Sequence, residues 1–398
     1  MKSVAVLGST GSVGRSTLAV LALHPERFRV HALAARRDVA GLLAQCLSHQ
    51  PEWAALAEPE AAAELERALR AAGSSVRVVA GAEAIAALAA DPGSQLVMAA
   101  ISGAAGLAST LRAARAGKRL LLANKESVVM AGPLLMAAVR AGGAQLIPID
   151  SEHNAIFQCL PAGSQCGLRP PGVRRLILTA SGGPFLDWSA EAMARATPEQ
   201  ACAHPRWQMG RKISVDSATL MNKGLELIEA CVLFGMPAAD VAVLVHPQSI
   251  VHSLVEYLDG STLAQLGAPD MRTPIAQALA WPERVAAGVE FLDLVRAGGL
   301  EFRSPDRQRF PCLALAEAAV RSGGPACTWL NAADEVAVQA FLDKQLNFAD
   351  IPAVIEAVMA QLPAGQMNDL ADVAALDCAA RACAREWLAR PAVAGALT

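Results

Sequence analysis

The 398-residue sequence has little of what marks several common classes of protein. Aromatic residues make up 4% of it, and its net charge of −3 leaves no basic excess of the kind that nucleic-acid phosphates require. No uncharged stretch reads as a membrane span. Nine cysteines form no CxxC pair and no regular framework, which favours reduced thiols. The first expected strand starts at Ser3, leaving no room for a targeting peptide. We therefore predict a cytoplasmic protein of two or three domains with no nucleic-acid or membrane partner.

The first 150 residues have the pattern of a dinucleotide-binding domain. The opening SVAVLGSTGSVGRSTLAVL is an apolar strand, a turn with Gly8, Gly11 and Gly14, and a helical pattern. Glycines permit a tight turn and close backbone approach, and the N-terminus of the following helix can meet a pyrophosphate. Strand and helix patterns then alternate through FRVHALAA, PEWAALAE, QLVMAAISGAAG, KRLLLANKES and AQLIPID. The sequence predicts a Rossmann-like parallel sheet with ligand-binding loops at the carboxyl ends of its strands.

The end of the second expected strand bears on the choice of cofactor. Arg36 and Arg37 favour NADP, because arginine accommodates a 2′-phosphate where an NAD enzyme usually offers a carboxylate to the ribose. Asp38 counts against this interpretation, and a solvated loop is the alternative for all three residues.

Two carboxylates stand where a buried strand of this sheet ends, in LIPIDSEHNAIFQ. Isolated buried charges are tolerated only when paired or bound to a metal, so Asp150 and Glu152 require a cation. A third carboxylate, Glu226, shares one helical face with Asn222 and Lys223 in the segment 204–231. Asp150, Glu152 and Glu226 together predict an oxygen-only site suited to Mg²⁺ or Mn²⁺.

The same segment leaves other interpretations open. A surface ion pair is the alternative for Lys223 and Glu226, and Glu229 is expected on the surface. The helix that carries them is expected to start at Asp216 or Ser217.

Polar residues in the middle of the chain predict a phosphate pocket. Ser181, in LILTASGGPF, ends an apolar strand at a glycine pair, as an anion-binding loop does. His204 and Trp207 lie in a segment flanked by proline and glycine that is expected to close over a ligand as a lid. Serine hydroxyls, an amide, a lysine and a histidine are a set suited to phosphate.

The remaining sequence predicts two further regions. VAVLVHP, SIVHSLVEYL and STLAQLG are expected to form an antiparallel meander that could seal a dimer, with a two-residue turn at Asp259 and Gly260. His246 and His252 are interpreted as structural histidines in preference to metal ligands. We predict an α/β catalytic and dimerisation domain over 151–285, a linker over 286–311 and a C-terminal helical bundle over 312–398.

These motifs resemble the 1-deoxy-D-xylulose 5-phosphate reductoisomerase family over nearly the whole chain. The resemblance is carried by GSTGSVG, AAISGAAGL, LLANKES, DSEHNAIFQ, SGGPF, HPRWQMGRKISVDSATLMNKGLE, HPQSIVHS, LAQLGAPDMRTPIAQALAWPERV and LNAADEVAV. It implies a homodimeric enzyme that rearranges 1-deoxy-D-xylulose 5-phosphate, most simply by retro-aldol cleavage and re-addition. NADPH then reduces the resulting aldehyde to 2-C-methyl-D-erythritol 4-phosphate, a precursor of isoprenoids.

The resemblance also implies a role for each site residue. The metal ligands would be Asp150, Glu152 and Glu226, which with Lys125 and His204 make up the catalytic set. Phosphate would be held by Ser181, Ser217, Asn222, Lys223 and His204, and the sugar by Lys125, Ser151 and Glu152. Trp207 and Met209 would belong to the closing flap. The cofactor would be contacted by Thr10, Gly11, Ser12 and Val13 at the pyrophosphate and by Asn124, Glu126 and Gly210 toward the nicotinamide. Arg36, Arg37 and Asp38 stand where the family commonly has a Gly-Lys-Asn type of stretch.

Two rival interpretations make separate predictions. A metal-independent NADP-dependent dehydrogenase of a small phosphorylated aldehyde would keep its activity in a chelator, but no cysteine lies in a motif suited to a semialdehyde dehydrogenase. A redox-sensing NADP-binding protein without enzymatic activity leaves the three carboxylates and the phosphate-type pocket unexplained.

Overall fold

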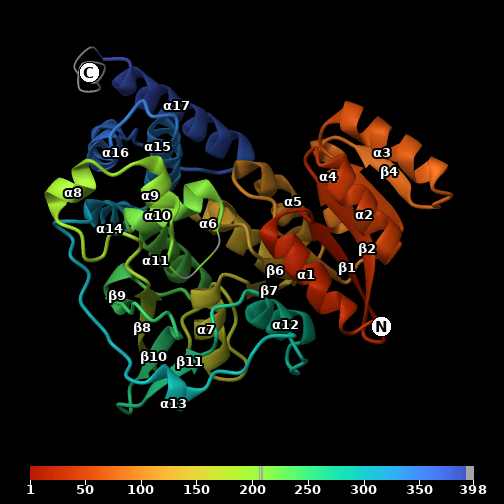
Figure 1. Ribbon diagram of the computed structural model, residues 1–398, viewed down its shortest axis with the longest axis horizontal. Coiled ribbons are helices and arrows are strands. Elements are labelled where there is room, and N and C mark those ends of the chain that lie inside the picture. Colours follow the sequence, from red (N-terminus) through yellow and green to blue (C-terminus); the bar gives the residue numbers. More distant parts are fainter. Residues whose placement is uncertain (206, 208, 391–398) are drawn as a thin grey trace. The chain divides into compact units, whose positions relative to one another are not determined.

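The computed structural model describes residues 1–205, 207 and 209–390 (Figure 1). The chain forms two compact units, each assembled from segments that are distant in sequence. The first unit contains Met1–Ser127, Pro133–Phe157 and Asp270–Phe291. The second contains Val128–Gly132, Gln158–Pro269 and the residues from Leu292 onward.

The first unit is built on a seven-stranded sheet in the order β4-β3-β2-β1-β5-β6-β7. Every neighbouring pair is parallel, and the strand order reverses beside β1, so the predicted Rossmann-like sheet is confirmed. The strands are β1 (Lys2–Leu7), β2 (Phe28–Ala35), β3 (Trp53–Leu56), β4 (Arg77–Ala80), β5 (Leu96–Ala99), β6 (Arg119–Leu122) and β7 (Gln145–Pro148).

Strand β4 was not expected from the sequence. Its four residues, RVVA, lie at the edge of the sheet and none of them is fully buried. A short edge strand has no need of the continuous apolar run that marks the buried strands of a parallel sheet.

Helices alternate with these strands and cover the sheet. Figure 1 shows α1 to α4 around the red and orange strands of the N-terminal half. Late in the chain, α12 returns to this unit, where Ile275 and Leu279 join the same core as Val4 and Leu18. The helices are α1 (Ser12–Ala22), α2 (Val39–His49), α3 (Pro59–Ala71), α4 (Ala82–Ala90), α5 (Leu107–Arg115), α6 (Lys125–Gly142), α7 (Ser151–Cys159) and α12 (Arg272–Ala280), of which α6 and α7 also contribute residues to the second unit.

The second unit contains a four-stranded mixed sheet in the order β11-β10-β8-β9. The hairpin of the predicted meander is present, because β10 and β11 pair antiparallel, but β9 does not pair with β10. Strand β8 lies between them and pairs parallel with β9, since the connection from β8 to β9 crosses over through helices. The strands are β8 (Val173–Ala180), β9 (Val241–Val245), β10 (Val251–Tyr257) and β11 (Thr262–Leu266).

The turn between β10 and β11 is longer than the predicted two residues. The N–H of Tyr257 donates to the carbonyl of Ser261 at 2.9 Å, which leaves a loop of three residues. Gly260 closes it with a φ of +88°, the left-handed conformation that three-residue hairpin loops place at this position.

Helices make up the rest of the second unit, and the predicted C-terminal helical region is confirmed for its described part; residues 391–398 lie outside it. The predicted helix start at Asp216 or Ser217 is wrong: both lie in the last turns of α10, and Leu220, with a φ of +60°, separates α10 from α11. No described helix is both long enough and apolar enough to span a bilayer. The helices are α8 (Ala190–Ala194), α9 (Pro198–Cys202), α10 (Arg211–Ala218), α11 (Met221–Leu233), α13 (Leu294–Ala297), α14 (Pro311–Ser322), α15 (Ala326–Leu342), α16 (Ile351–Met359) and α17 (Leu370–Leu388).

Candidate functional site

The glycine-rich loop after β1 depends on the absence of side chains. Gly8 has a φ of +88°, and a Cβ there would lie 2.3 Å from the carbonyl oxygen of Ala100. A Cβ on Gly14 would lie 2.3 Å from the carbonyl oxygen of Gly8, so this glycine lets α1 pack directly on the loop. Gly11 is the N-cap of α1 and is exposed, which leaves the first amides of the helix accessible to an anion. The loop therefore has the close backbone packing that a pyrophosphate site needs.

Most of the other predicted cofactor residues lie on this loop or on neighbouring loops of the first unit, whereas Gly210 belongs to the second unit. Thr10, Ser12 and Val13 are part of the exposed or half-exposed turn around Gly11. Asn124 is buried and caps α6, and its side-chain amide donates to the carbonyls of Ile101 and Gly103 and to the Glu126 carboxylate at 2.6, 3.0 and 3.1 Å. Its side chain thus ties two loops together and orients Glu126.

The residues after β2 have two different environments. Arg36 and Arg37 are exposed, with the Arg36 guanidinium 3.3 Å from the carboxylate of Glu58. The side chain of Asp38 accepts a hydrogen bond from the N–H of Gly41 and caps α2. Asp38 is exposed as well, but its carboxylate is engaged by its own helix, so the two arginines are the cationic groups that this loop offers.

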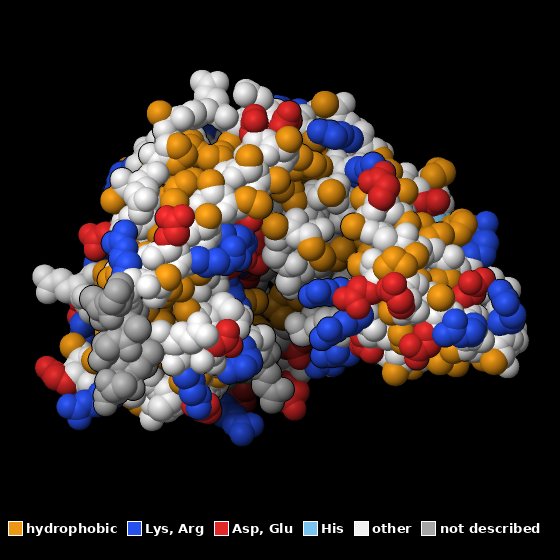
Figure 2. Space-filling view, turned by 90° about the horizontal axis from the view of Figure 1, so that it is seen from above, with side chains coloured by type: hydrophobic (Ala, Val, Ile, Leu, Met, Phe, Trp, Pro, Cys, Tyr) orange, Lys and Arg blue, Asp and Glu red, His pale blue; other side chains and the backbone are white. Residues whose placement is uncertain are grey.

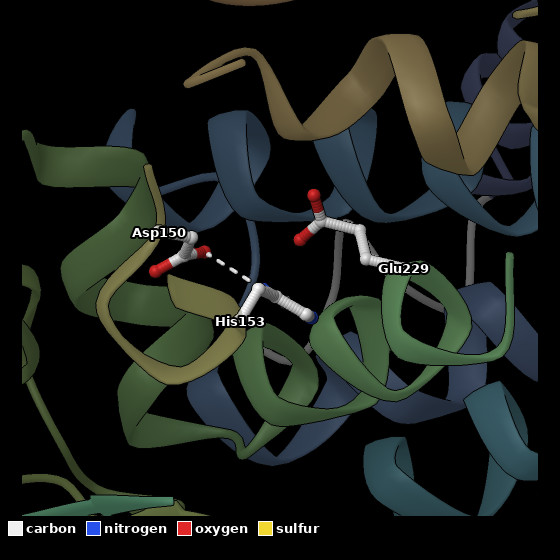
Figure 3. Close-up of side chains that lie close together, drawn as sticks. All are labelled: Asp150, His153 and Glu229. Carbon is white, nitrogen blue, oxygen red and sulfur yellow. Dashed lines mark ion pairs between the residues drawn. The ribbon is translucent and has the colours of Figure 1, made fainter. Parts of the chain in front are cut away.

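Asp150 follows β7 and immediately precedes α7. Its carboxylate Oδ2 lies 2.8 Å from Nζ of Lys125, which begins α6, and 4.0 Å from Nδ1 of the buried His153 (Figure 3). One residue along, the Ser151 hydroxyl donates to the Glu152 carboxylate at 2.6 Å. The first unit thus brings Lys125, Asp150, Ser151 and Glu152 to the loops after β6 and β7, as the strand pattern predicted.

In the second unit, the loop after β8 contacts the predicted lid. The N–H of Trp207 donates to Nδ1 of His204 at 2.9 Å, so a neutral imidazole carries its proton on Nε2. That Nε2 lies 2.9 Å from Oγ of Ser181, which also accepts from the N–H of Gly183 at 3.1 Å. Because Ser181 already accepts two hydrogen bonds, its own proton can be donated to an anion. Burial lowers the pKa of His204, which favours this neutral arrangement.

The last turn of α10 packs against the same loop. A Cβ on Gly183 would lie 2.5 Å from the carbonyl oxygen of Ser217, so this glycine allows the two backbones to meet. Gly210 caps the other end of α10 and is exposed, and Met209 before it is partly buried. The ring of Trp207 lies 6.3 Å from that of His252, centroid to centroid. This helix therefore connects the lid segment to the Ser181 loop.

The surface interpretation of Lys223 and Glu226 is wrong. Both side chains are buried on α11 and form an ion pair, and the Asn222 amide donates to the Glu226 carboxylate at 2.5 Å. The shared helical face predicted for these three residues is confirmed. Glu229, whose side chain is labelled in Figure 3, is also buried, so the surface position expected for it is wrong. A buried carboxylate that keeps its charge needs cationic or donor partners, and Lys223 and Asn222 are such partners for Glu226.

The two histidines interpreted as structural are buried in the second unit. Nδ1 of His246 lies 2.7 Å from the carbonyl of Glu301, and its ring stacks on Phe302. Burial lowers the pKa of His252 to about 4, so it is neutral at physiological pH.

The ion pairs of Lys212 and Asp334 were not predicted from the sequence, and neither residue belongs to the predicted site. Nζ of Lys212 lies 2.7 Å from the carboxylate of Asp216 and 2.9 Å from that of Asp334 on α15. A lysine four residues before an aspartate is a recognisable helical pair, but its second partner is 122 positions away in the numbering of the chain.

Three carboxylates and the distribution of surface charge bear on the kind of ligand that the protein takes. Asp150 and Glu152 in the first unit and Glu226 in the second each carry carboxylate oxygens, the ligand type that Mg²⁺ and Mn²⁺ prefer, and Glu226 is the buried one of the three. On the face drawn in Figure 2, basic and acidic side chains of the described residues are interspersed, without one continuous basic area. This mixture suits a small ligand better than a nucleic acid.

Comparisons with known proteins agree with this set of residues. Three family models match the chain. The model of 1-deoxy-D-xylulose 5-phosphate reductoisomerase matches residues 4–132, and the model of the C-terminal domain of that enzyme matches residues 146–234. A third model, the DXP reductoisomerase C-terminal domain, matches residues 266–383. The enzymes of that name from Cellvibrio japonicus and Nitrosococcus oceani are 56% and 55% identical, over 98% of this chain and 99% and 100% of theirs.

Solved structures give the same result. A structure of DOX-P reductoisomerase in complex with NADPH, fosmidomycin and magnesium is 47% identical with a TM-score of 0.93, and covers 98% of both chains. The reductoisomerase from Zymomonas mobilis in complex with NADPH is 48% identical with a TM-score of 0.91, over 98% of this chain and 99% of that one. The chain belongs to the 1-deoxy-D-xylulose 5-phosphate reductoisomerase family.

Proposed function

We propose that this protein converts 1-deoxy-D-xylulose 5-phosphate to 2-C-methyl-D-erythritol 4-phosphate with NADPH and a divalent metal ion, in non-mevalonate isoprenoid precursor synthesis. The observation that carries this function is the match to a reductoisomerase of that family over 98% of this chain at 56% identity. NADPH supplies the hydride for the reduction, and Mg²⁺ or Mn²⁺ acts as a Lewis acid on the substrate's oxygens.

The residues of the first unit fit a phosphorylated dinucleotide. Gly8 and Gly14 let β1 and α1 pack around the loop, and the Gly11 N–H closes it by donating to the Gly8 carbonyl at 3.1 Å. The amides of Ser12 and Val13, at the start of α1, can then face the pyrophosphate. Exposed Arg36 and Arg37 supply positive charge for a 2′-phosphate, and Asp38 is occupied as a helix cap. Asn124 orients Glu126, which with Gly210 is proposed to border the nicotinamide.

The proposed metal ligands are Asp150, Glu152 and Glu226. Their chemistry fits a hard divalent cation, since each supplies a carboxylate oxygen and none of the three is a soft ligand. Lys125 pairs with Asp150 and Lys223 with Glu226, so each of these carboxylates has a positive charge beside it. Lys125 and Ser151 are proposed to orient the sugar's oxygens beside these carboxylates.

Phosphate binding is assigned to the second unit. Ser181 can donate its proton because it accepts from His204 and Gly183, and Ser217 lies where α10 meets the same loop. Lys223 and Asn222 contribute a positive charge and an amide from α11. Trp207 and Met209 belong to the segment proposed to close over the substrate and exclude water.

We also propose that the enzyme is a cytoplasmic homodimer. Strand β11 is an edge of its sheet, and the exposed apolar side chains of Leu258 and Leu263 lie in the β10–β11 hairpin. Phe291 is 99% exposed and Val295 92% exposed, which is unfavourable for a protein that stays monomeric. The nine cysteines all lie in the described part of the chain and form no disulfide bond, which fits a reducing compartment. Sedimentation at two protein concentrations tests the dimer.

The assay that tests the function follows the loss of NADPH absorbance with 1-deoxy-D-xylulose 5-phosphate before and after removal of metal. We expect oxidation that stops with a chelator and returns with Mg²⁺ or Mn²⁺. Oxidation that continues in the chelator would favour the metal-independent dehydrogenase instead, and folded protein that gives no oxidation with fresh metal would exclude both.

A further inference from the structure

Helix α10 is positioned by a buried cluster of charges that has no part in the reaction proposed above. Asp334, in the middle of α15, is 0% exposed and Asp216 is 1% exposed. Nζ of Lys212 lies within 3 Å of both carboxylates, at 2.7 Å from Asp216 and 2.9 Å from Asp334. One ammonium is therefore shared by two buried carboxylates from two helices.

This cluster continues to the C-terminal helix. Glu335, next to Asp334, lies 2.5 Å from the guanidinium of Arg381 on α17, and Arg381 also pairs with Asp377 at 2.7 Å. The face of α15 toward α10 and its face toward α17 are thus both fixed by ion pairs. Because α15 is anchored on both sides, it can act as a fixed reference for the position of α10.

The position of α10 matters because both of its ends belong to the proposed substrate site. Its N-cap, Gly210, follows the lid residues Trp207 and Met209. Its last turn contains Ser217 and contacts the loop of Ser181 through Gly183. A small shift or rotation of this eight-residue helix would change the spacing of the two serines and the point where the lid begins.

We propose that Asp334 is a positioning residue for substrate phosphate: through Lys212 and Asp216 it fixes α10, and so the spacing of Ser217 and Ser181 and the start of the lid. This proposal rests on the phosphate site of the proposed function. It assigns Asp334 no contact with substrate, NADPH or metal.

A contribution to stability does not account for a carboxylate at the fully buried position of Asp334. Desolvation raises the pKa of Asp334, and the charge of Glu335 acts in the same direction, whereas Lys212 lowers this pKa. The pKa of the nearby Cys312 thiol is raised by burial and by the charges of Asp334 and Asp216. Replacing a buried ion pair by well-packed apolar groups is often neutral or stabilising, and removing one partner is costly when it leaves the other charge unpaired. Lys212 would keep Asp216 as a partner if Asp334 lost its charge. Asp334 lowers stability and still connects α15 to α10 through Lys212, so we expect its role to be the positioning of α10.

The test is Asp334→Asn, which keeps the shape of the side chain and leaves the pair of Lys212 and Asp216. Asp343→Asn, at the exposed C-cap of the same helix, is the matched control for the change in charge. We expect KM for 1-deoxy-D-xylulose 5-phosphate to rise by about threefold to tenfold in Asp334→Asn, with Kd for NADPH unchanged and the melting temperature not lowered. Asp343→Asn should leave all three quantities unchanged.

A second probe separates this proposal from the assignment of the reaction. Binding of inorganic phosphate, followed by the tryptophan fluorescence of the protein without substrate, should weaken by the same factor as KM. If the wild-type protein gives no reductoisomerase activity, the proposed function fails and phosphate binding still tests Asp334. Wild-type phosphate affinity in Asp334→Asn overturns the positioning role.

If Asp334→Asn does not fold, Lys212→Arg tests the same proposal. This substitution keeps the positive charge and changes the geometry of the group that the two carboxylates share. It should weaken phosphate binding while NADPH binding persists. Unchanged KM and phosphate affinity in Lys212→Arg would also overturn the proposal, as would a fall in melting temperature of Asp334→Asn with normal KM in the folded protein.

Discussion

The dinucleotide loop of the first unit and the polar cluster around Ser181 and His204 in the second unit are built by different means. The loop is made of backbone, and Gly8 and Gly14 matter because no Cβ fits beside Ala100 or Gly8 itself. The cluster is made of side chains, each oriented by another: Trp207 fixes the tautomer of His204, which in turn leaves the Ser181 proton for a ligand. A backbone site is therefore vulnerable to added volume, whereas a side-chain site is vulnerable to lost hydrogen bonds and charge.

The acidic groups give the largest expected effect. Glu226→Gln removes a charge from a buried side chain that pairs with Lys223, and it should lower kcat/KM by about a hundredfold or more. Mn²⁺ affinity, measured by the electron paramagnetic resonance of free Mn²⁺, should fall with it, while NADPH affinity should not. Glu356→Gln, on the exposed side of α16, is the control. Full activity of Glu226→Gln would remove Glu226 from the metal site.

The backbone nature of the dinucleotide loop is tested by Gly14→Ala. The added Cβ would meet the Gly8 carbonyl oxygen at 2.3 Å and Ser9 Cα at 2.5 Å, so the loop must distort. Strain of about 1 to 3 kcal/mol corresponds to a Kd for NADPH raised by roughly tenfold to a hundredfold. Phosphate affinity in the second unit should stay at its wild-type value. Gly299→Ala, where a Cβ has open space, is the matched control, and equal NADPH affinity in the two variants would contradict the packing argument.

The side-chain nature of the second site is tested by His204→Ala. The imidazole of His204 is the partner of both the Ser181 hydroxyl and the Trp207 N–H, and the substitution removes it. KM for the sugar phosphate should rise by about tenfold, and NADPH affinity should be unchanged. His49→Ala, on α2 of the first unit, serves as control. A normal KM in His204→Ala would show that Ser181 does not depend on this histidine.

The pH dependence of the same site follows from the pKa of His204, which burial lowers from the ordinary value of 6.5. A lowered pKa means that the fold favours the neutral ring, so its contribution is complete above 6.5 and is lost as the pH falls through the lowered value. KM should therefore rise in acid, and this rise should be absent in His204→Ala. An acid limb of the same size in both would assign it to another group.

The smallest expected effect concerns stability. Burial raises the pKa of Asp334, so folding favours its protonated form. At neutral pH the ionised form therefore lowers the free energy of unfolding. Asp334→Asn should melt a few degrees higher than the wild type near pH 7, and the difference should shrink as the pH falls toward the ordinary carboxyl pKa of 3.8. Thermal unfolding at several pH values measures it. A difference that grows in acid would reverse the sign of the argument.

Local patterns were sufficient for most of the fold. Apolar runs that end at glycine or polar loops predicted six of the seven parallel strands, because buried parallel strands must be apolar on both faces. Strand β4 was missed because an exposed edge strand has no such run. The order of the second sheet could not be predicted, since neighbouring apolar segments do not reveal that β8 enters between β9 and β10.

The candidate site divides in the same way. Spacing alone placed Asn222, Lys223 and Glu226 on one helical face, because three and four residues are one turn of a helix. Burial was not predictable for Lys223 and Glu226 or for Glu229, because it depends on which elements cover that helix.

The sequence by itself determined the glycine loop, the strand-end carboxylates and the phosphate-type residues, because each depends on neighbours within a few positions of the chain. Only the tertiary structure decided that α12 returns to the core of the first unit and that Lys212 shares its charge with Asp334. Those contacts join residues far apart in the chain, and packing of whole helices, which no local pattern encodes, brings them together.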